Sequence, residues 1–67
     1  MTIYKIIDIV GISDKSFSDA AKNAVIEASK TVRGIKRAAI TTMDIKVEKD
    51  KPVKFRAEVK ISFEIER

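Results

Sequence analysis

The side chains that could do chemistry in this sequence are carboxylates, lysines, arginines and one tyrosine, because the chain contains no histidine and no cysteine. Thiolate and imidazole sites for zinc and other transition metals are therefore excluded, as are disulfides and cysteine nucleophiles. A general base would need a perturbed carboxylate, lysine or tyrosine, and no such pair stands out. Gly11 and Gly34 stand alone, so no glycine-rich nucleotide loop is present. We therefore expect a protein that is not an enzyme.

Four acids are candidate ligands for a hard cation: Asp8, Asp44, Glu58 and Glu64. Carboxylate and carbonyl oxygens suffice for calcium or magnesium, although the spacing of an EF-hand is absent. In a symmetric oligomer, one acid per subunit can meet its copies at a rotation axis, so a single acid per chain could complete a site. The alternative is that these acids, which stand among polar or alternating positions, are solvated or form surface ion pairs.

The net charge of +4 raises the question of a polyanionic partner. Basic residues alternate with acids along the whole chain, and only Arg33, Lys36 and Arg37 come close to a cluster. Nucleic-acid binding favours a concentrated basic face, often with stacking aromatic residues. The charge pattern therefore argues against nucleic acid as the natural partner.

The first element that must position these residues is a strand over residues 3–10, IYKIIDIV, which is rich in β-branched residues and which we expect to end in a turn at Gly11. Apolar side chains occupy both of its faces: Tyr4, Ile6 and Val10 on one, and Ile3, Ile7 and Ile9 on the other. A thin monomer cannot bury both faces of a strand. The second face therefore predicts a contact between subunits.

A helix is predicted to begin after Ser16, because Ser16 and Asp19 have the spacing of an N-cap and a capping-box acid. Its apolar residues recur at three- and four-residue steps: Phe17, Ala20, Ala21, Ala24, Val25, Ala28 and Val32. The small alanine side chains would let another surface approach closely, and Gly34 is expected to end the helix.

Two long strands are predicted in the second half of the chain. Residues 37–49 alternate, which places one set of side chains on a single face: Ala39, Thr41, Met43, Ile45 and Val47. Residues 53–66 alternate strictly between apolar and polar, and Pro52 lies in the turn between the two strands. The fold class is therefore α+β: one βαββ domain over residues 1–67, with a three-stranded antiparallel sheet wrapped around one helix and with its strand order left open.

At 67 residues, a single domain has a marginal core, and without disulfides or a structural metal it needs another source of stability. Oligomerisation is the remaining source. No apolar run approaches the ~20 residues that span a membrane, and the first residues lack the order of a signal peptide. We therefore expect a soluble, unexported protein of the cytoplasm.

The opening segment IYKIIDIVGISDKSFSDAAKNAV and the closing segment FRAEVKISFEI resemble the dodecin family, and the resemblance covers nearly the whole chain. It implies a βαββ subunit that assembles into a hollow homododecamer. Such particles are not enzymes, and in many members they bind and sequester flavins such as FMN, riboflavin or FAD. The need for oligomerisation, which follows from chain length alone, agrees with this expectation.

Flavin-binding dodecins carry a tryptophan after the helix that stacks on the flavin ring, and a glutamine in the last strand that hydrogen-bonds the ring edge. By this resemblance, Arg37 and Arg56 stand at those positions. Two hypotheses remain open. Either the arginines pair with acids such as Glu58 on a polar surface, or they bind an anionic ligand such as a phosphorylated flavin, because guanidinium groups stack on rings and grip phosphates.

Another branch of the family lacks the tryptophan, has an arginine at the later position and is associated with calcium; the resemblance does not say which acids would serve. The sequence thus predicts a dodecin-like homo-oligomer that stores or buffers a small ligand of the flavin or nucleotide class. The alternatives are a calcium-binding dodecin without flavin, a purely structural shell and a weak nucleic-acid binder.

Overall fold

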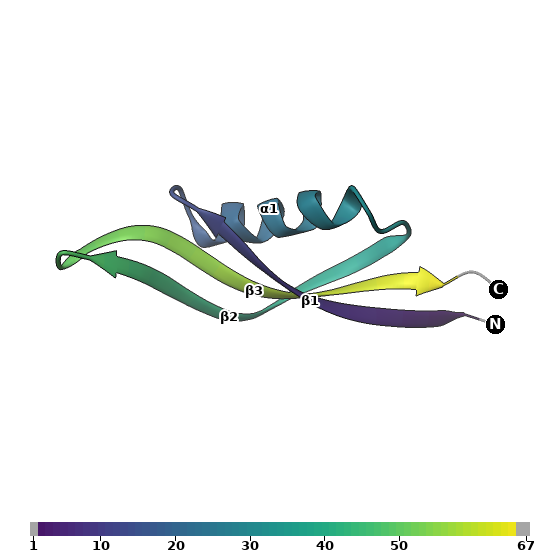
Figure 1. Ribbon diagram of the computed structural model, residues 1–67. Helices are drawn as coiled ribbons and strands as arrows, with labels where there is room; N and C mark the ends of the chain where they lie inside the picture. Colours follow the sequence, from purple (N-terminus) through teal and green to yellow (C-terminus); the bar gives the residue numbers. More distant parts are fainter. Residues whose placement is uncertain (1, 66–67) are drawn as a thin grey trace.

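Three strands form one antiparallel sheet, and a single helix covers one of its faces in this computed structural model (Figure 1). The structure describes residues 2–65. Its elements, in chain order, are β1 (Ile3–Ser13), α1 (Phe17–Ser29), β2 (Ile35–Glu48) and β3 (Lys51–Ile65). The strand order is β1-β3-β2, so β3 lies in the centre and pairs with both neighbours. The predicted βαββ fold with its antiparallel sheet is confirmed.

The core lies between α1 and the central strand β3. Alternate residues of β3 face the helix, as the strict alternation of residues 53–66 predicts for the part of that range that the structure describes. The buried apolar residues are Ala20, Ala24, Ala28, Ala57, Val59 and Ile61. Burying a Val or Ile side chain fully contributes about 1.5–3 kcal/mol, so a core this small stabilises the chain only modestly.

Gly11 lies inside β1 and does not end it, so the predicted turn at this position is wrong. The reason is the close approach of α1. A Cβ atom at Gly11 would collide with the carbonyl oxygen of Ala20 and lie 3.0 Å from the Cβ of Ala24. Glycine is therefore required for packing, and the strand continues beneath the helix to Ser13.

The start of α1 agrees with its sequence signal, but its end does not. The backbone N–H of Asp19 donates to Ser16 Oγ at 3.0 Å, which confirms the N-cap, while the Asp19 carboxylate accepts from Ser13 Oγ at 2.6 Å. The helix ends at Ser29, before Gly34, and Val32 lies outside it. Lys30 still has helical dihedrals and the N–H of Val32 still donates to the Ala28 carbonyl, but β-branched Thr31 and Val32 favour a helix less, and the chain leaves it there. Gly34, with φ of +77°, instead turns the chain into β2.

β2 contains a bulge that reverses its side-chain alternation at Thr41. Ile40 is paired with Val59 and Thr42 with Glu58, so Thr41 is the extra residue, and its hydroxyl donates to the Glu58 carbonyl at 3.2 Å. The predicted grouping of residues 39 to 47 on one face is therefore wrong. The residues of β2 on the same side as α1 are Ala38, Ile40, Met43 and Ile45.

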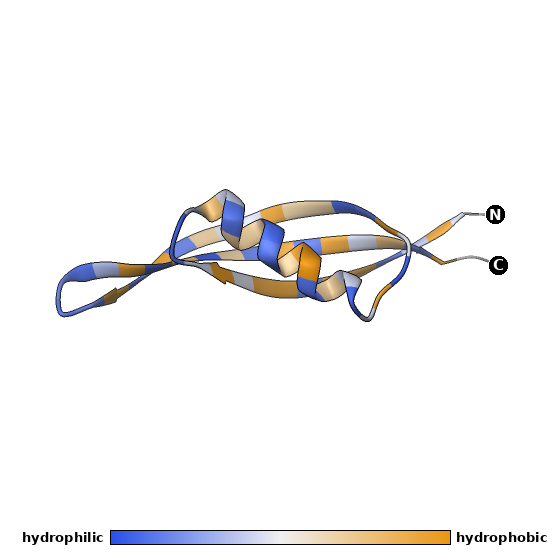
Figure 2. Ribbon diagram, turned by 90° about the horizontal axis from the view of Figure 1, so that it is seen from above, coloured by the Kyte–Doolittle hydropathy of each residue, from blue (hydrophilic) through white to orange (hydrophobic). Residues whose placement is uncertain are grey.

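Figure 2 shows hydrophilic residues interleaved with apolar ones along α1, hydrophilic residues at the tip of the β2–β3 hairpin, and apolar positions along the strands. Among residues 2–65, no helix has the length and apolar character that crossing a membrane requires.

Candidate functional site

All six residues that the sequence singles out lie on the face of the sheet away from α1, which is termed the outer face. Arg56, Glu58 and Glu64 alternate along β3 with residues that face the helix, so they point the opposite way. Direct cross-strand partners share a face. The three other residues are placed by their partners: Asp8 opposite Lys60, Arg37 opposite Ser62 and Asp44 opposite Arg56.

Arg37 lines a hollow of about 330 Å³ on this face together with Tyr4, Ile6 and Ser62. The residues Tyr4 and Ile6 are more than half exposed, at 56% and 57%. None of the ion pairs formed within residues 2–65 includes Arg37. The hollow therefore combines an aromatic ring, an aliphatic wall and a guanidinium group that no neighbouring acid neutralises, a set that suits a flat anionic molecule.

Arg56 pairs with an acid, but with Asp44 and not with Glu58. Its Nε lies 3.5 Å from Asp44 Oδ1, and both side chains are about half exposed, so the pair adds little stability. One subunit does not bring the two arginines together. Ser62, which lies opposite Arg37, is separated from Arg56 by about 20 Å along β3. The two arginines of one subunit therefore do not form one compact site.

Three acids form a row across the sheet, with Glu58 on β3 between Asp8 on β1 and Asp44 on β2. Each outer acid is the diagonal neighbour of Glu58 in the strand register, at a spacing of about 7–8 Å. Asp8 accepts from Lys60 Nζ at 3.1 Å, and Asp44 is held by Arg56. Glu58 forms no ion pair within the described part of the chain.

Glu64 lies apart from this row and is 3.9 Å from Lys36 Nζ. Within residues 2–65, no three acids come close enough to hold a metal ion. A calcium site on the outer face would therefore need carboxylates from more than one copy of the chain.

Sequence reasoning did not identify Tyr4, Ile6 and Ser62 as neighbours of Arg37. A signal was present, since apolar residues occur on both faces of the first strand. This signal could not identify the neighbours of Arg37. Tyr4 and Ile6 of β1 lie near Arg37 of β2 because β3 pairs with both strands, and the sequence leaves the strand order open.

A family model described as Dodecin matches residues 3–66 of the chain. The calcium dodecin of Mycobacterium tuberculosis is 34% identical over 65 residues, which cover 97% of this chain and 92% of that protein. Its crystal structure, described as that of a calcium-chelating antigen with a novel calcium-binding site, matches with a TM-score of 0.85 at 33% identity, over 96% of this chain and 91% of that one.

The dodecin of Streptomyces coelicolor matches with a TM-score of 0.92 at 26% identity, over 98% of this chain and 94% of that one. These likenesses extend over all four elements and therefore include the outer face of the sheet.

Proposed function

The chain belongs to the dodecin family, and from this we propose that it is a non-enzymatic homo-oligomer that binds calcium on the outer face of its sheet. The observation that carries the proposal is the acidic row of Asp8, Glu58 and Asp44, in a chain 34% identical to a calcium dodecin. The arginine at position 37, where flavin-binding members have a stacking tryptophan, supports a ligand other than flavin.

The chemistry of the row fits a hard cation. Calcium takes six to eight oxygen ligands, and one subunit offers widely spaced carboxylates. Where the outer faces of two or more copies meet, the row of each copy would supply oxygens to a shared ion. Glu58 is the central ligand in this proposal because no basic side chain within residues 2–65 competes for it.

The test is thermal unfolding of chelator-treated protein, with and without calcium. Calcium should raise the melting temperature, and chelator should reverse the shift, because a ligand that binds only the folded state stabilises it by mass action. Glu58→Gln should abolish most of the shift. Glu27→Gln, which removes an exposed acid of α1, is the matched control and should leave the shift intact. An unchanged melting temperature, with no calcium retained in native mass spectrometry, would refute calcium binding.

A second candidate function is binding of an anionic ring compound of the flavin class. The hollow of Tyr4, Ile6, Arg37 and Ser62 favours it, because Arg37 is available there to a phosphate. The test is quenching of flavin fluorescence, with FMN expected to bind about tenfold more tightly than riboflavin if a guanidinium contacts its phosphate. Equal binding would exclude a role of Arg37 in phosphate recognition. A purely structural shell would respond to neither calcium nor flavin.

A further inference from the structure

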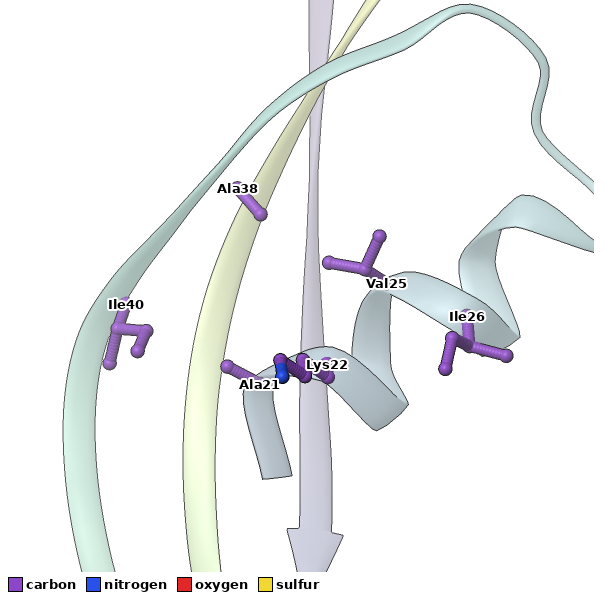
Figure 3. A pocket seen from close by; sticks show the side chains of 6 residues that line it. All are labelled: Ala21, Lys22, Val25, Ile26, Ala38 and Ile40. Atoms are coloured by element: carbon purple, nitrogen blue, oxygen red, sulfur yellow. The ribbon is translucent and has the colours of Figure 1, made fainter. Parts of the chain in front are cut away.

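A groove between α1 and β2 is an apolar surface that no residue of the described range 2–65 fills. Its walls are drawn in Figure 3: Ala21, Lys22, Val25, Ile26, Ala38 and Ile40. The hollow measures about 370 Å³, and Ile26 and Ile40 are 56% and 45% exposed. The groove exists because α1 packs on β1 and β3 and scarcely touches β2.

A second uncovered apolar surface lies on the arm, defined as residues 45–55 of the β2–β3 hairpin. Figure 1 shows this hairpin extending past the N-terminal end of α1. A helix of 13 residues is about 20 Å long, whereas the longest dimension of the molecule is 51 Å. Ile45 and Val47 of the arm are 43% and 58% exposed. The helix of the same chain is thus too short to cover the arm.

The bulge at Thr41 places the groove and the arm on the same side of the sheet. Ile40 precedes the bulge and Ile45 follows it, yet both have cross-strand partners that face the helix side. Without the extra residue, the two would point to opposite faces. Bulges often re-aim side chains in this way. The result is one continuous apolar band along β2, from the groove to the arm.

The surface of the isolated chain is larger than that of a compact monomer by about the area that one protein–protein interface buries. Its accessible area is 5248 Å², against about 4,200 Å² for a compact protein of this mass. Its radius of gyration is 13.7 Å, against about 11 Å for a compact domain of this length. The excess of roughly 1,000 Å² compares with about 800 Å² per partner in a standard interface.

We infer that the groove is occupied by the arm of a second copy of this chain, with Ile45 of one copy packed near Ile26 of the next. The inference rests on the self-association in the proposed function and adds which surfaces meet. Groove and arm are present in equal numbers in any homo-oligomer. Because they are different surfaces, two copies can exchange arms about a two-fold axis or several copies can form a ring, and either arrangement closes when every groove holds an arm.

The test uses the absence of cysteine, which allows thiols to be placed at will. An Ile26→Cys/Ile45→Cys variant is treated with a short bis-maleimide cross-linker and separated on a denaturing gel. The control is Glu27→Cys/Ile45→Cys, because Glu27 adjoins Ile26 in sequence but lies on the β1 side of α1. We expect at least about fivefold more dimers and higher species with the first variant, since cross-linking requires thiols to be close.

Native mass spectrometry of both variants separates the possible failures. An intact oligomer that links equally through both pairs, or through neither, would overturn the placement of the arm while leaving self-association standing. A monomer for the unmodified chain would overturn self-association, and with it this interface.

Discussion

Gly11 is a residue whose identity is fixed by packing. It lies where β1 passes beneath α1, with the carbonyl of Ala20 directly above it. Gly11→Ala should therefore destabilise the protein by about 3 kcal/mol or more, because either the helix or the strand must move. Thermal unfolding followed by circular dichroism measures the loss.

Gly34→Ala is the informative comparison for that substitution. Gly34 has a φ of +77°, and an added Cβ would lie 3.2 Å from the Glu64 carbonyl oxygen. The left-handed backbone costs a residue with a side chain about 1–2 kcal/mol, so the destabilisation should be the smaller of the two. If the Gly11→Ala variant is as stable as the unmodified protein, α1 does not approach β1 this closely.

The two arginines permit a direct test of the position that the family resemblance assigns to them. Arg37→Trp combined with Arg56→Gln should increase flavin affinity by about tenfold, because an indole restores stacking and an amide restores a neutral hydrogen bond. Fluorescence titration with riboflavin measures the change. Arg33→Trp adds an indole in the preceding loop and should not reproduce it. No gain in the double variant would mean that the assigned positions are wrong.

At the scale of elements, α1 depends on its N-cap because the helix is short and its buried face consists of alanines. Ser16→Ala removes the acceptor for the Asp19 N–H and should cost about 1 kcal/mol. Ser16→Asp keeps a capping oxygen and should retain most of the stability. If both variants unfold at the same temperature, the cap contributes through some property other than its hydrogen bond.

The elements that the sequence predicts well are those with local signals. The cap at Ser16 marks the start of α1, and the strict alternation after Pro52 identifies β3 together with its buried face. The predicted helix end at Gly34 and the predicted turn at Gly11 are both wrong, because a glycine can either form a turn or permit close packing, and the sequence does not show which. Gly11 permits close packing, which depends on a helix that comes later in the chain, and Gly34 makes a turn that lies beyond the helix.

The faces of β2 and the composition of the site depend on register, which is not a local property. Counting alternate residues across Thr41 assigns Ala39 and Met43 to one face, whereas the bulge separates them. The shared outer face of Asp44, Arg56 and Glu58 could be anticipated only in part, from the alternation of β3. That Glu58 lies between two other acids required the order β1-β3-β2.

At the scale of the whole molecule, both faces of the sheet leave apolar side chains uncovered. Tyr4 and Ile6 lie on the outer face, and Ile40 and Ile45 lie on the helix side. The sequence predicted the first of these surfaces from the two-sided apolar pattern of residues 3–10. The sequence did not predict the second surface, because the bulge at Thr41 changes which residues of β2 share a face. An assembly that covers both would supply the burial that a 67-residue chain lacks.

If most of the stability resides in the interfaces between copies, the melting temperature must depend on protein concentration. Dilution by about a hundredfold reduces the contribution of association by about 2.7 kcal/mol for each interface that separates on unfolding. For a chain of this size, that corresponds to a fall in melting temperature on the order of 10 °C. Differential scanning fluorimetry over that range of protein concentration measures the fall in melting temperature. Ser16→Ala should lower the melting temperature by a similar amount at every concentration, so the dependence on concentration should not change. A melting temperature that stays constant on dilution would mean that the isolated chain is stable by itself, despite the small core between α1 and β3.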